Sequence, residues 1–251
     1  MPVNCVVAEI SSGRSSLAIP IARTARKVYA VDTAYRELKS ITARAAQEDL
    51  ANIVPICTDS EQLPLGAKSC DVVIMIGALD RVSKGMGAEK PWETQLRLLT
   101  SVFNALVPGG FAYVSVDNKL DIRRMFGRKG AHSGLPFTGL IWSRLAGTTS
   151  RVFGRNGDRR LTHSTRGLRR LLTQSGFAYT ETVFPLPGHQ VFRFMSAFES
   201  RRTARFVYSR MRSHPKFKHR HYLAANAMVS LGLHRQFAPS IGMVAYKPGA
   251  S

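Results

Sequence analysis

The feature of this sequence that most restricts its fold is an alternation of short β-rich runs with longer helical patterns in its first half. Most of the β-rich runs are separated by stretches whose apolar residues recur at helical spacing. The runs cover residues 4–10, 27–31, 53–58, 71–76 and 111–116. Strands connected through helices pair in parallel, with right-handed crossovers. The first half therefore predicts an α/β fold with a doubly wound, mostly parallel sheet.

The second half departs from this alternation after Asn118. Residues 119–162 are rich in Arg, Gly and aromatic side chains and lack clear periodicity, which predicts a basic insertion. A helix is expected over 163–176, a strand over 177–184, and a last strand over 240–246. These additions bring the predicted sheet to seven strands.

The same patterns predict the domain organisation. Residues 185–238 are mostly helical and very basic, which predicts a basic helical cap attached to the core. The core then comprises residues 1–184 and 239–251, with the basic insertion inside it. No stretch approaches the about 20 apolar residues that a membrane-spanning helix needs. We therefore expect a cytoplasmic protein, with peripheral attachment to the inner face of the membrane as an alternative.

The three cysteines, Cys5, Cys57 and Cys70, show no metal-type spacing. Each lies in or beside an apolar run that predicts a strand. Buried, reduced thiols are therefore expected, and no metal site.

Acidic residues follow the first three predicted strands, at the sheet edge where α/β folds bind ligands. Glu9 is followed by a turn containing Gly13, Asp32 stands 23 residues beyond Glu9, and Asp59 follows the third run. This pattern is typical of nucleoside binding, because the glycine turn brings the backbone to the ligand and the acid accepts hydrogen bonds from the ribose. Helix capping is the alternative role for Asp32 and Asp59.

The order of the motifs resembles the class I S-adenosylmethionine-dependent methyltransferases, a Rossmann-like superfamily whose last strand is antiparallel. The motifs are the turn from Glu9 to Ser15, Asp32, an Asp-x-x-x-Leu-Pro segment from Asp59 to Pro64, a strand from Asp71, and a Leu-x-Pro-Gly-Gly turn from Leu106 to Gly110. The resemblance implies S-adenosylmethionine as the cofactor and S-adenosylhomocysteine as its product. The implied cofactor-binding residues are Glu9, Ser11, Ser12, Gly13, Asp32, Thr33, Asp59, Ser60 and Gly77.

The resemblance also implies individual roles. Asp32 would hold the ribose hydroxyls and Asp59 the adenine amino group. Glu9 would position the turn and the methionine amino end, and Gly77 would line the methyl group. Each motif is weak alone, and five in the right order make the family assignment specific.

The glycine turn departs from the family pattern, because Ser11 and Ser15 stand where the family has glycine. Glycine serves in such turns because it tolerates a positive φ and leaves room for the ligand. A serine costs little if its φ stays negative, and its hydroxyl is able to bind the cofactor carboxylate. The alternative is a site that has lost its cofactor.

A second, less specific resemblance is to methyltransferases from bacterial cell-surface polysaccharide and glycosyl-modification clusters. It rests on the segments 132–137, 164–172 and 185–187. This resemblance predicts methyl transfer to a hydroxyl of a saccharide, a lipid-linked glycan or a related small metabolite. A hydroxyl acceptor gains from a general base, and His132 is the candidate. A structural or merely exposed histidine is the alternative.

The net positive charge is confined to the second half. The chain of 251 residues carries a net charge of +20, yet residues 1–117 hold 12 basic and 12 acidic side chains, leaving 24 and 4 for residues 118–251. An anionic partner is expected along residues 118–235: RNA or another nucleic acid, a membrane surface, or a polyanionic glycan. A cap with solvated arginines remains equally open.

Two functions compete with O-methylation. One is a non-catalytic, methyltransferase-like module that holds nucleic acid through the basic half, as the changed glycine turn suggests. The other is an RNA methyltransferase. The signature of adenine or cytosine amino methylation, Asn/Asp-Pro-Pro-Tyr, is missing after the fourth strand, where residues 77–80 read Gly-Ala-Leu-Asp. This disfavours methylation of base amino groups.

Overall fold

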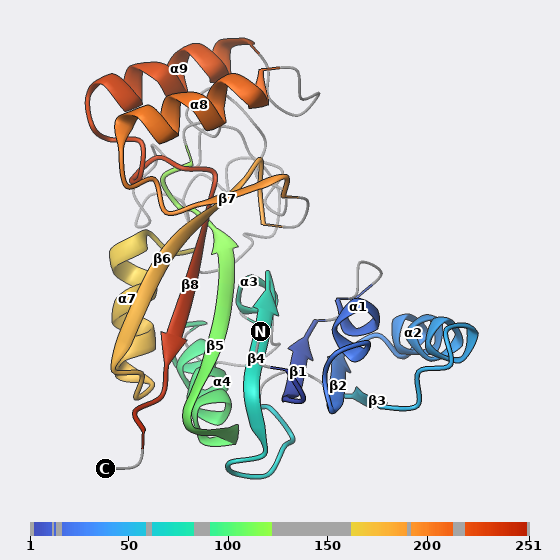
Figure 1. The fold of residues 1–251 in the computed structure, drawn as a ribbon. Coiled ribbons are helices and arrows are strands. Elements are labelled where there is room, and N and C mark those ends of the chain that lie inside the picture. The colour runs from blue at the N-terminus through green and yellow to red at the C-terminus, as the bar shows by residue number, and fades with distance from the viewer. Residues whose placement is uncertain are drawn as a thin grey trace, which may run out of the picture. The chain divides into compact units, whose positions relative to one another are not determined.

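In the computed structural model, residues 3–11, 13, 17–58, 62–82, 91–121, 162–189, 192–212 and 219–249 are described. Their strands form one sheet in the order β3-β2-β1-β4-β5-β8-β6-β7 (Figure 1). The strands are β1 (Val6–Ile10), β2 (Lys27–Asp32), β3 (Ile53–Cys57), β4 (Cys70–Ile76), β5 (Leu106–Asp117), β6 (Tyr179–Leu186), β7 (Phe194–Ser196) and β8 (Ser240–Tyr246). The described part of the sheet has eight strands, against the seven expected, because β7 adds a short strand.

The first five strands pair in parallel, in the order β3-β2-β1-β4-β5. The last long strand runs the other way: Gly109 at the start of β5 donates to Lys247 beyond the end of β8, and Asn118 after β5 donates to Pro239 before β8. These contacts confirm the expected antiparallel last strand. The class I methyltransferase-like topology is therefore present.

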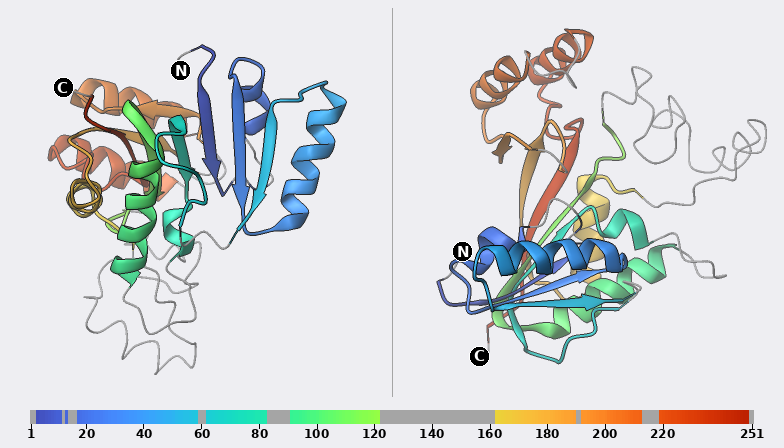
Figure 2. Two further views of the ribbon diagram at one scale, coloured as in Figure 1. Left: turned by 90° about the horizontal axis from the view of Figure 1, so that it is seen from below. Right: turned by 90° about the vertical axis from the view of Figure 1, so that its right-hand side faces the viewer.

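The helices alternate with the strands as expected. They are α1 (Ala18–Ala22), α2 (Tyr35–Gln47), α3 (Leu79–Val82), α4 (Pro91–Ala105), α7 (Thr165–Gln174), α8 (Arg201–Met211) and α9 (His219–Ser230). In Figure 2, α1 and α2 lie on one side of the sheet formed by β1, β2 and β3, while α4 lies on the other side. The doubly wound arrangement is confirmed.

The chain divides into two compact units. The first comprises residues 1–115, 169–181 and 243–251, and the second comprises 116–168 and 182–242. Strands β5, β6 and β8 each pass from one unit to the other. The domain boundaries expected from the sequence remain a prediction.

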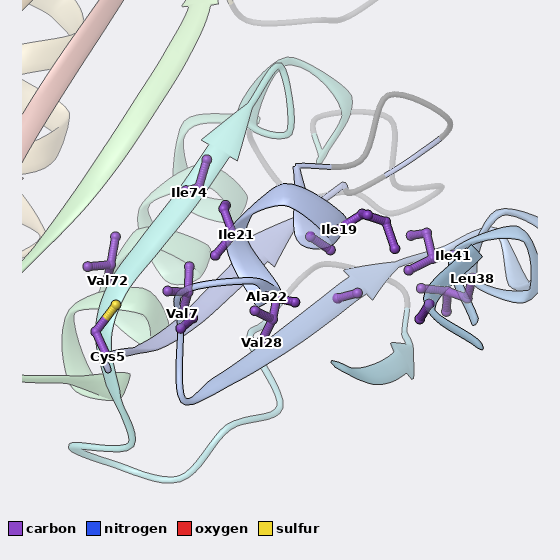
Figure 3. Packing of buried hydrophobic residues seen from close by; sticks show 14 residues of the cluster. Cys5, Val7, Ile19, Ile21, Ala22, Val28, Leu38, Ile41, Val72 and Ile74 are labelled. Carbon is purple, nitrogen blue, oxygen red and sulfur yellow. The ribbon is translucent and has the colours of Figure 1, made fainter. Parts of the chain in front are cut away.

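The first unit has an apolar core between α1, α2 and one face of the sheet (Figure 3). Ile19 and Ile21 of α1 meet Val7 and Val28 of the strands, all at most 9% exposed. Side chains alternate along a strand, so Val72 and Ile74 of β4 face this core while the fully buried neighbours at 73 and 75 face the opposite side. Both faces of the central strands are therefore covered.

The Pro-Gly-Gly segment differs from the simple turn that the sequence suggested. The helix α4 ends at Ala105, and β5 already begins at Leu106. The register with β4 then shifts, so that Cys70 pairs with Leu106 while Val72 pairs with Phe111. A β-carbon at Gly110 would lie 2.8 Å from the Asp71 carbonyl oxygen, which explains the glycine there. The segment forms a bulge inside the strand.

The cysteine prediction is correct for two of three residues. Cys5 and Cys70 are buried, and burial raises the pKa of both thiols. Cys57 is exposed, because β3 is an edge strand whose face is largely open to solvent. Among the described helices, none combines the length and the apolar character that crossing a bilayer requires.

Candidate nucleoside site at the carboxyl ends of the strands

Glu9 shapes the turn after β1 by binding the start of α1. This side chain is 5% exposed, and its two carboxylate oxygens accept hydrogen bonds from the Leu17 and Ala18 main-chain N–H groups at 2.9 and 2.8 Å. Leu17 provides no side-chain cap for α1, so the Glu9 carboxylate takes that place. Negative charge at a helix N-terminus is also favourable. The expected role of Glu9 in positioning the turn agrees with this contact.

Asp32 connects the glycine turn to the next helix. One carboxylate oxygen accepts a hydrogen bond from Gly13 N–H at 2.9 Å, and the other accepts from Ala34 N–H at 2.9 Å. Ala34 is the N-cap residue of α2 and brings no side-chain cap, so Asp32 closes the turn before α2 and is not the N-cap that the alternative role required. A carboxylate has about four lone-pair positions, so two remain for ribose hydroxyls.

Ser11 occupies the left-handed region, with φ of +61°, and its N–H donates to the Val31 carbonyl at 2.8 Å. The condition under which a serine would cost little in this turn, a negative φ, is therefore not met at Ser11. The next described residue, Gly13, also has a positive φ, of +44°. The backbone therefore keeps the glycine-type turn despite the serine, with strain at Ser11.

Replacing Ser11 with Gly is expected to stabilise the protein by about 1 kcal/mol, because the left-handed strain of an L-residue disappears. Thermal unfolding of the two proteins measures the effect. Ser40→Gly is the matched comparison: it lies inside α2 and should destabilise by about 0.5 kcal/mol, the difference in helix propensity between Ser and Gly. Equal melting temperatures for Ser11→Gly and the unchanged protein would contradict the strain assigned to Ser11.

Gly77 lies at the same edge of the sheet. It follows β4 with φ of +68°, it is buried, and its N–H donates to the Ser115 carbonyl at 2.8 Å. Ile10 pairs with Val31 and with Met75, so the ends of β1, β2 and β4 are neighbours. The structure thus brings together Glu9, Ser11, Gly13, Asp32 and Gly77 at the carboxyl ends of three strands.

Of the remaining predicted site residues, the structure describes one and leaves four outside the described residues. Thr33 is described and exposed directly after Asp32. Ser12, Asp59, Ser60 and His132 lie outside the described residues. Thr58 N–H donates to the Asp32 carbonyl, so the chain that leads to residue 59 starts beside Asp32.

The residues at this edge fit a nucleoside cofactor. The turn has positive φ at both Ser11 and Gly13, and a β-carbon at Gly13 would meet, among the described residues, only the Ser11 carbonyl oxygen at 3.7 Å. Asp32 retains lone pairs for a diol. Among the described residues, no group of three or more His, Cys, Asp or Glu side chains is placed to hold a metal ion.

A second polar cluster, which the sequence analysis missed, lies in the second unit. His189 is 3% exposed, and its Nδ1 lies 3.3 Å from the Asp117 carboxylate and 3.3 Å from the Ser240 hydroxyl. No pattern in the sequence points to His189, because it stands in an irregular segment after a Pro-Gly pair and far along the chain from Asp117. Only the pairing of distant strands brings these side chains together.

Burial also affects His163, next to the end of β5. This residue is 3% exposed, and its backbone forms an isolated parallel β-bridge with Asn118. Burial, with a smaller contribution from the nearby Lys119 charge, lowers the pKa of His163 to about 4. Its imidazole is therefore neutral at physiological pH.

Comparisons with known proteins agree with this geometry. The family model described as a methyltransferase domain matches residues 8–114. A SAM-dependent methyltransferase from Methanosarcina mazei has a similar structure, with a TM-score of 0.57 and 13% identity, over 100% of this chain and 95% of that one. No curated protein matches the sequence.

Two further solved structures show how widely this fold is used. Phosphoethanolamine N-methyltransferase 2 from Haemonchus contortus, in complex with phosphomonomethylethanolamine and S-adenosylhomocysteine, has a TM-score of 0.55 and 14% identity. The whole of this chain (100%) aligns with 50% of that enzyme, so the chain spans half of the enzyme's length. The cyclase SpnF has a TM-score of 0.55 and 15% identity, over 100% of this chain and 77% of that one. At these identities the likeness shows the fold.

The matched residues 8–114 include Glu9, Gly13, Asp32 and Gly77, the side chains and turn positions that meet at the sheet edge. Motif order, strand order and family match agree. Residues 8–114 match the family model of a methyltransferase domain, and the strand order is that of the class I methyltransferase-like fold.

Proposed function

We propose that this methyltransferase transfers a methyl group from S-adenosylmethionine to a hydroxyl of a saccharide, a lipid-linked glycan or a related small metabolite. The observation that carries the cofactor assignment is the Asp32 carboxylate, which accepts a hydrogen bond from Gly13 N–H in the turn after β1 and retains lone pairs for ribose hydroxyls. Glu9 fixes the other side of the turn through α1.

When bound, the cofactor supplies a methyl group that its sulfonium already activates. The chain has to bind the cofactor, orient the acceptor oxygen toward that methyl group and exclude water. Asp32 and the turn at 11–13 are the groups that would hold the nucleoside. The Asp59 segment would hold the adenine, as the family resemblance implies.

The competing hypothesis, a non-catalytic methyltransferase-like module, depends on the serines that replace two glycines of the turn. The positive φ of Ser11 favours a retained site, because the turn keeps the left-handed backbone that a glycine would adopt.

Calorimetric titration with S-adenosylhomocysteine tests the cofactor assignment directly. We expect saturable binding by the whole chain with a one-to-one stoichiometry. Adenosine is the comparison ligand, and should bind more weakly because it lacks the amino-acid portion beside the turn. Folded protein that shows no heat of binding at millimolar S-adenosylhomocysteine would refute the enzyme assignment.

We also propose that the second unit attaches to an anionic lipid surface through α8. Its buried side chains 204, 207, 208 and 211 pack in an apolar cluster, while Arg202, Arg205, Phe206 and Ser209 form the opposite, exposed face. Phe206 is 56% exposed, and the Arg210 guanidinium lies over its ring at 5.4 Å. No acidic residue occurs from 200 to the end of the sequence. Arginines around an exposed aromatic ring suit an anionic interface.

A double substitution, Arg202→Gln with Arg205→Gln, is expected to weaken binding to phosphatidylglycerol vesicles about 30-fold, since each arginine near such a surface contributes about 1 kcal/mol. Vesicle flotation measures this binding. The matched control is Tyr35→Ser in α2, which removes an exposed ring beside Lys39 in the first unit and should leave flotation unchanged. Unchanged flotation of the double variant, or binding to RNA alone, would contradict a lipid partner.

A further inference from the structure

We infer that α9 inserts an apolar ridge, formed by Leu223, Ala227 and Leu231, into the hydrocarbon boundary of a membrane whose headgroups bind α8. This inference rests on the proposed attachment of α8 to an anionic lipid surface and deepens it. All residues concerned belong to the second unit. The arginines of α8 would bind the headgroups, and the leucines of α9 would enter the acyl chains.

The two helices lie antiparallel beside each other (Figure 1). The guanidinium of Arg212, just after α8, lies over the ring of Tyr222, in the first turn of α9, at 5.7 Å. At the other end, a β-carbon at Gly232 would lie 3.1 Å from the Arg201 guanidinium, so the start of α8 lies beside the end of α9. Both helices turn buried side chains toward the same apolar cluster. Their exposed faces are therefore both directed away from that cluster.

The exposed face of α9 carries the apolar ridge. Leu223 is 57% exposed and Leu231 is 64% exposed, and Ala227, also exposed, lies between them. A spacing of four residues places the three side chains on one side of a helix. Leu231 follows the last residue of α9, and its N–H donates to the Ala227 carbonyl at 3.0 Å, so the helical turn extends to it. Single exposed leucines are ordinary, but a row of apolar side chains on one face indicates a partner.

The charges around the ridge favour an anionic lipid surface over other partners. Arg220 is exposed on α9, Arg202 and Arg205 are exposed on α8, and no acidic residue occurs from 200 to the end of the sequence. A second copy of the hairpin would therefore bring arginines against arginines, which is unfavourable. RNA would pair with the arginines but leave the leucines in water. A lipid surface satisfies both, because it offers headgroup phosphates to the arginines and acyl chains to the leucines.

The two parts of this contact differ in their response to salt. The attraction between arginines and headgroups is screened, since the Debye length falls from about 10 Å in 0.1 M salt to about 3 Å in 1 M salt. Removal of leucine side chains from water involves no charge and is not screened. Membrane binding should therefore keep a salt-resistant component that depends on the ridge.

The test measures flotation of the full chain with phosphatidylglycerol vesicles in about 0.1 M and about 1 M NaCl. The ridge variant, Leu223→Gln with Leu231→Gln, is expected to bind about 100-fold more weakly at both salt concentrations, at about tenfold for each leucine. Ala227→Leu, which enlarges the ridge, should bind about tenfold more tightly. This gain keeps the inference testable if the ridge variant fails to fold, which its melting temperature shows.

Two further variants serve as comparisons in the same assay. Arg202→Gln with Arg205→Gln should weaken flotation in about 0.1 M NaCl but bind like the unmodified protein in about 1 M NaCl. Val3→Gln, which removes an exposed apolar side chain from the first unit, should leave flotation unchanged at both concentrations.

A second readout reports insertion directly. Leu223→Trp is mixed with vesicles whose phosphatidylglycerol carries bromine on the acyl chains, because bromine quenches indole fluorescence on contact. We expect stronger quenching than for the native tryptophans of the unmodified protein. Tyr35→Trp, at an exposed position of α2 in the first unit, should add no quenching.

The outcomes separate this inference from the proposal that it deepens. Equal flotation of the unmodified protein and the ridge variant in about 1 M NaCl, or no added quenching for Leu223→Trp, would overturn the insertion and leave the headgroup contact of α8. A dimer that the ridge variant dissociates, in sedimentation without vesicles, would also overturn it and assign the ridge to a second copy. Absence of flotation by the unmodified protein at both salt concentrations would overturn the lipid attachment itself, and the insertion with it.

Discussion

Asp32→Ala is expected to weaken S-adenosylhomocysteine binding by about 100-fold or more. Hydrogen bonds to a charged group contribute about 1.5–3 kcal/mol each, and the carboxylate would lose two from the ribose. The substitution also frees the Gly13 and Ala34 N–H groups that now shape the turn. Calorimetric titration of the variant measures the affinity.

Loss of folding has to be separated from loss of ligand contact. Asp71 provides the matched control, because its carboxylate accepts a hydrogen bond from Val6 N–H at 2.7 Å at the amino end of the same sheet. Asp71→Ala should lower the melting temperature but leave the affinity unchanged. If both variants lost affinity equally, the effect would be structural and Asp32 would not be a ligand contact.

Asp32→Asn gives a finer test of the same contact. The amide keeps one acceptor oxygen for the turn and replaces the other by a donor, which cannot accept from Ala34 N–H. We expect an affinity between those of the unmodified protein and Asp32→Ala. An affinity equal to that of the unmodified protein would show that the charge of Asp32 is unimportant for binding.

The first unit was largely predictable because its determinants are local. Each strand is a short apolar run and most are followed by a helical pattern, so the order and parallel pairing followed from residues near one another in the sequence. The positions of Glu9, Gly13 and Asp32 at strand ends followed for the same reason. Their hydrogen bonds did not, because a carboxylate at a strand end suits capping and ligand binding equally well.

The second unit was less predictable because its contacts join distant segments. The Asp117–His189–Ser240 cluster depends on how β5, β6 and β8 end beside one another. The short strand β7 pairs antiparallel with the end of β6, where Pro185 pairs with Met195, and prolines argue against a strand in sequence analysis. Ser11 is a further case: its residue type leaves the sign of its φ open, and the structure shows a positive φ where its N–H donates to the Val31 carbonyl oxygen.

Acid is expected to destabilise the protein through His163. Its pKa is lowered to about 4 in the folded state from its usual value of 6.5, first by burial and then by the charge of Lys119. As pH falls below 6.5, the unfolded chain binds the proton before the folded chain does. The free energy of unfolding is therefore unaffected above about pH 7 and falls by about 2 kcal/mol by pH 5 and about 3 kcal/mol by pH 4.

Urea unfolding at pH 7 and pH 5 measures this loss, and His163→Gln removes the titrating group. The variant should lose about 2 kcal/mol less than the unmodified protein between the two pH values, whatever its stability at pH 7. His219→Gln, at an exposed histidine of α9, is the matched control and should keep the full loss. Because carboxylates also titrate at acid pH, the decisive quantity is the difference in slope between the two variants. Identical slopes for His163→Gln and His219→Gln would contradict the assignment of the acid effect to buried His163.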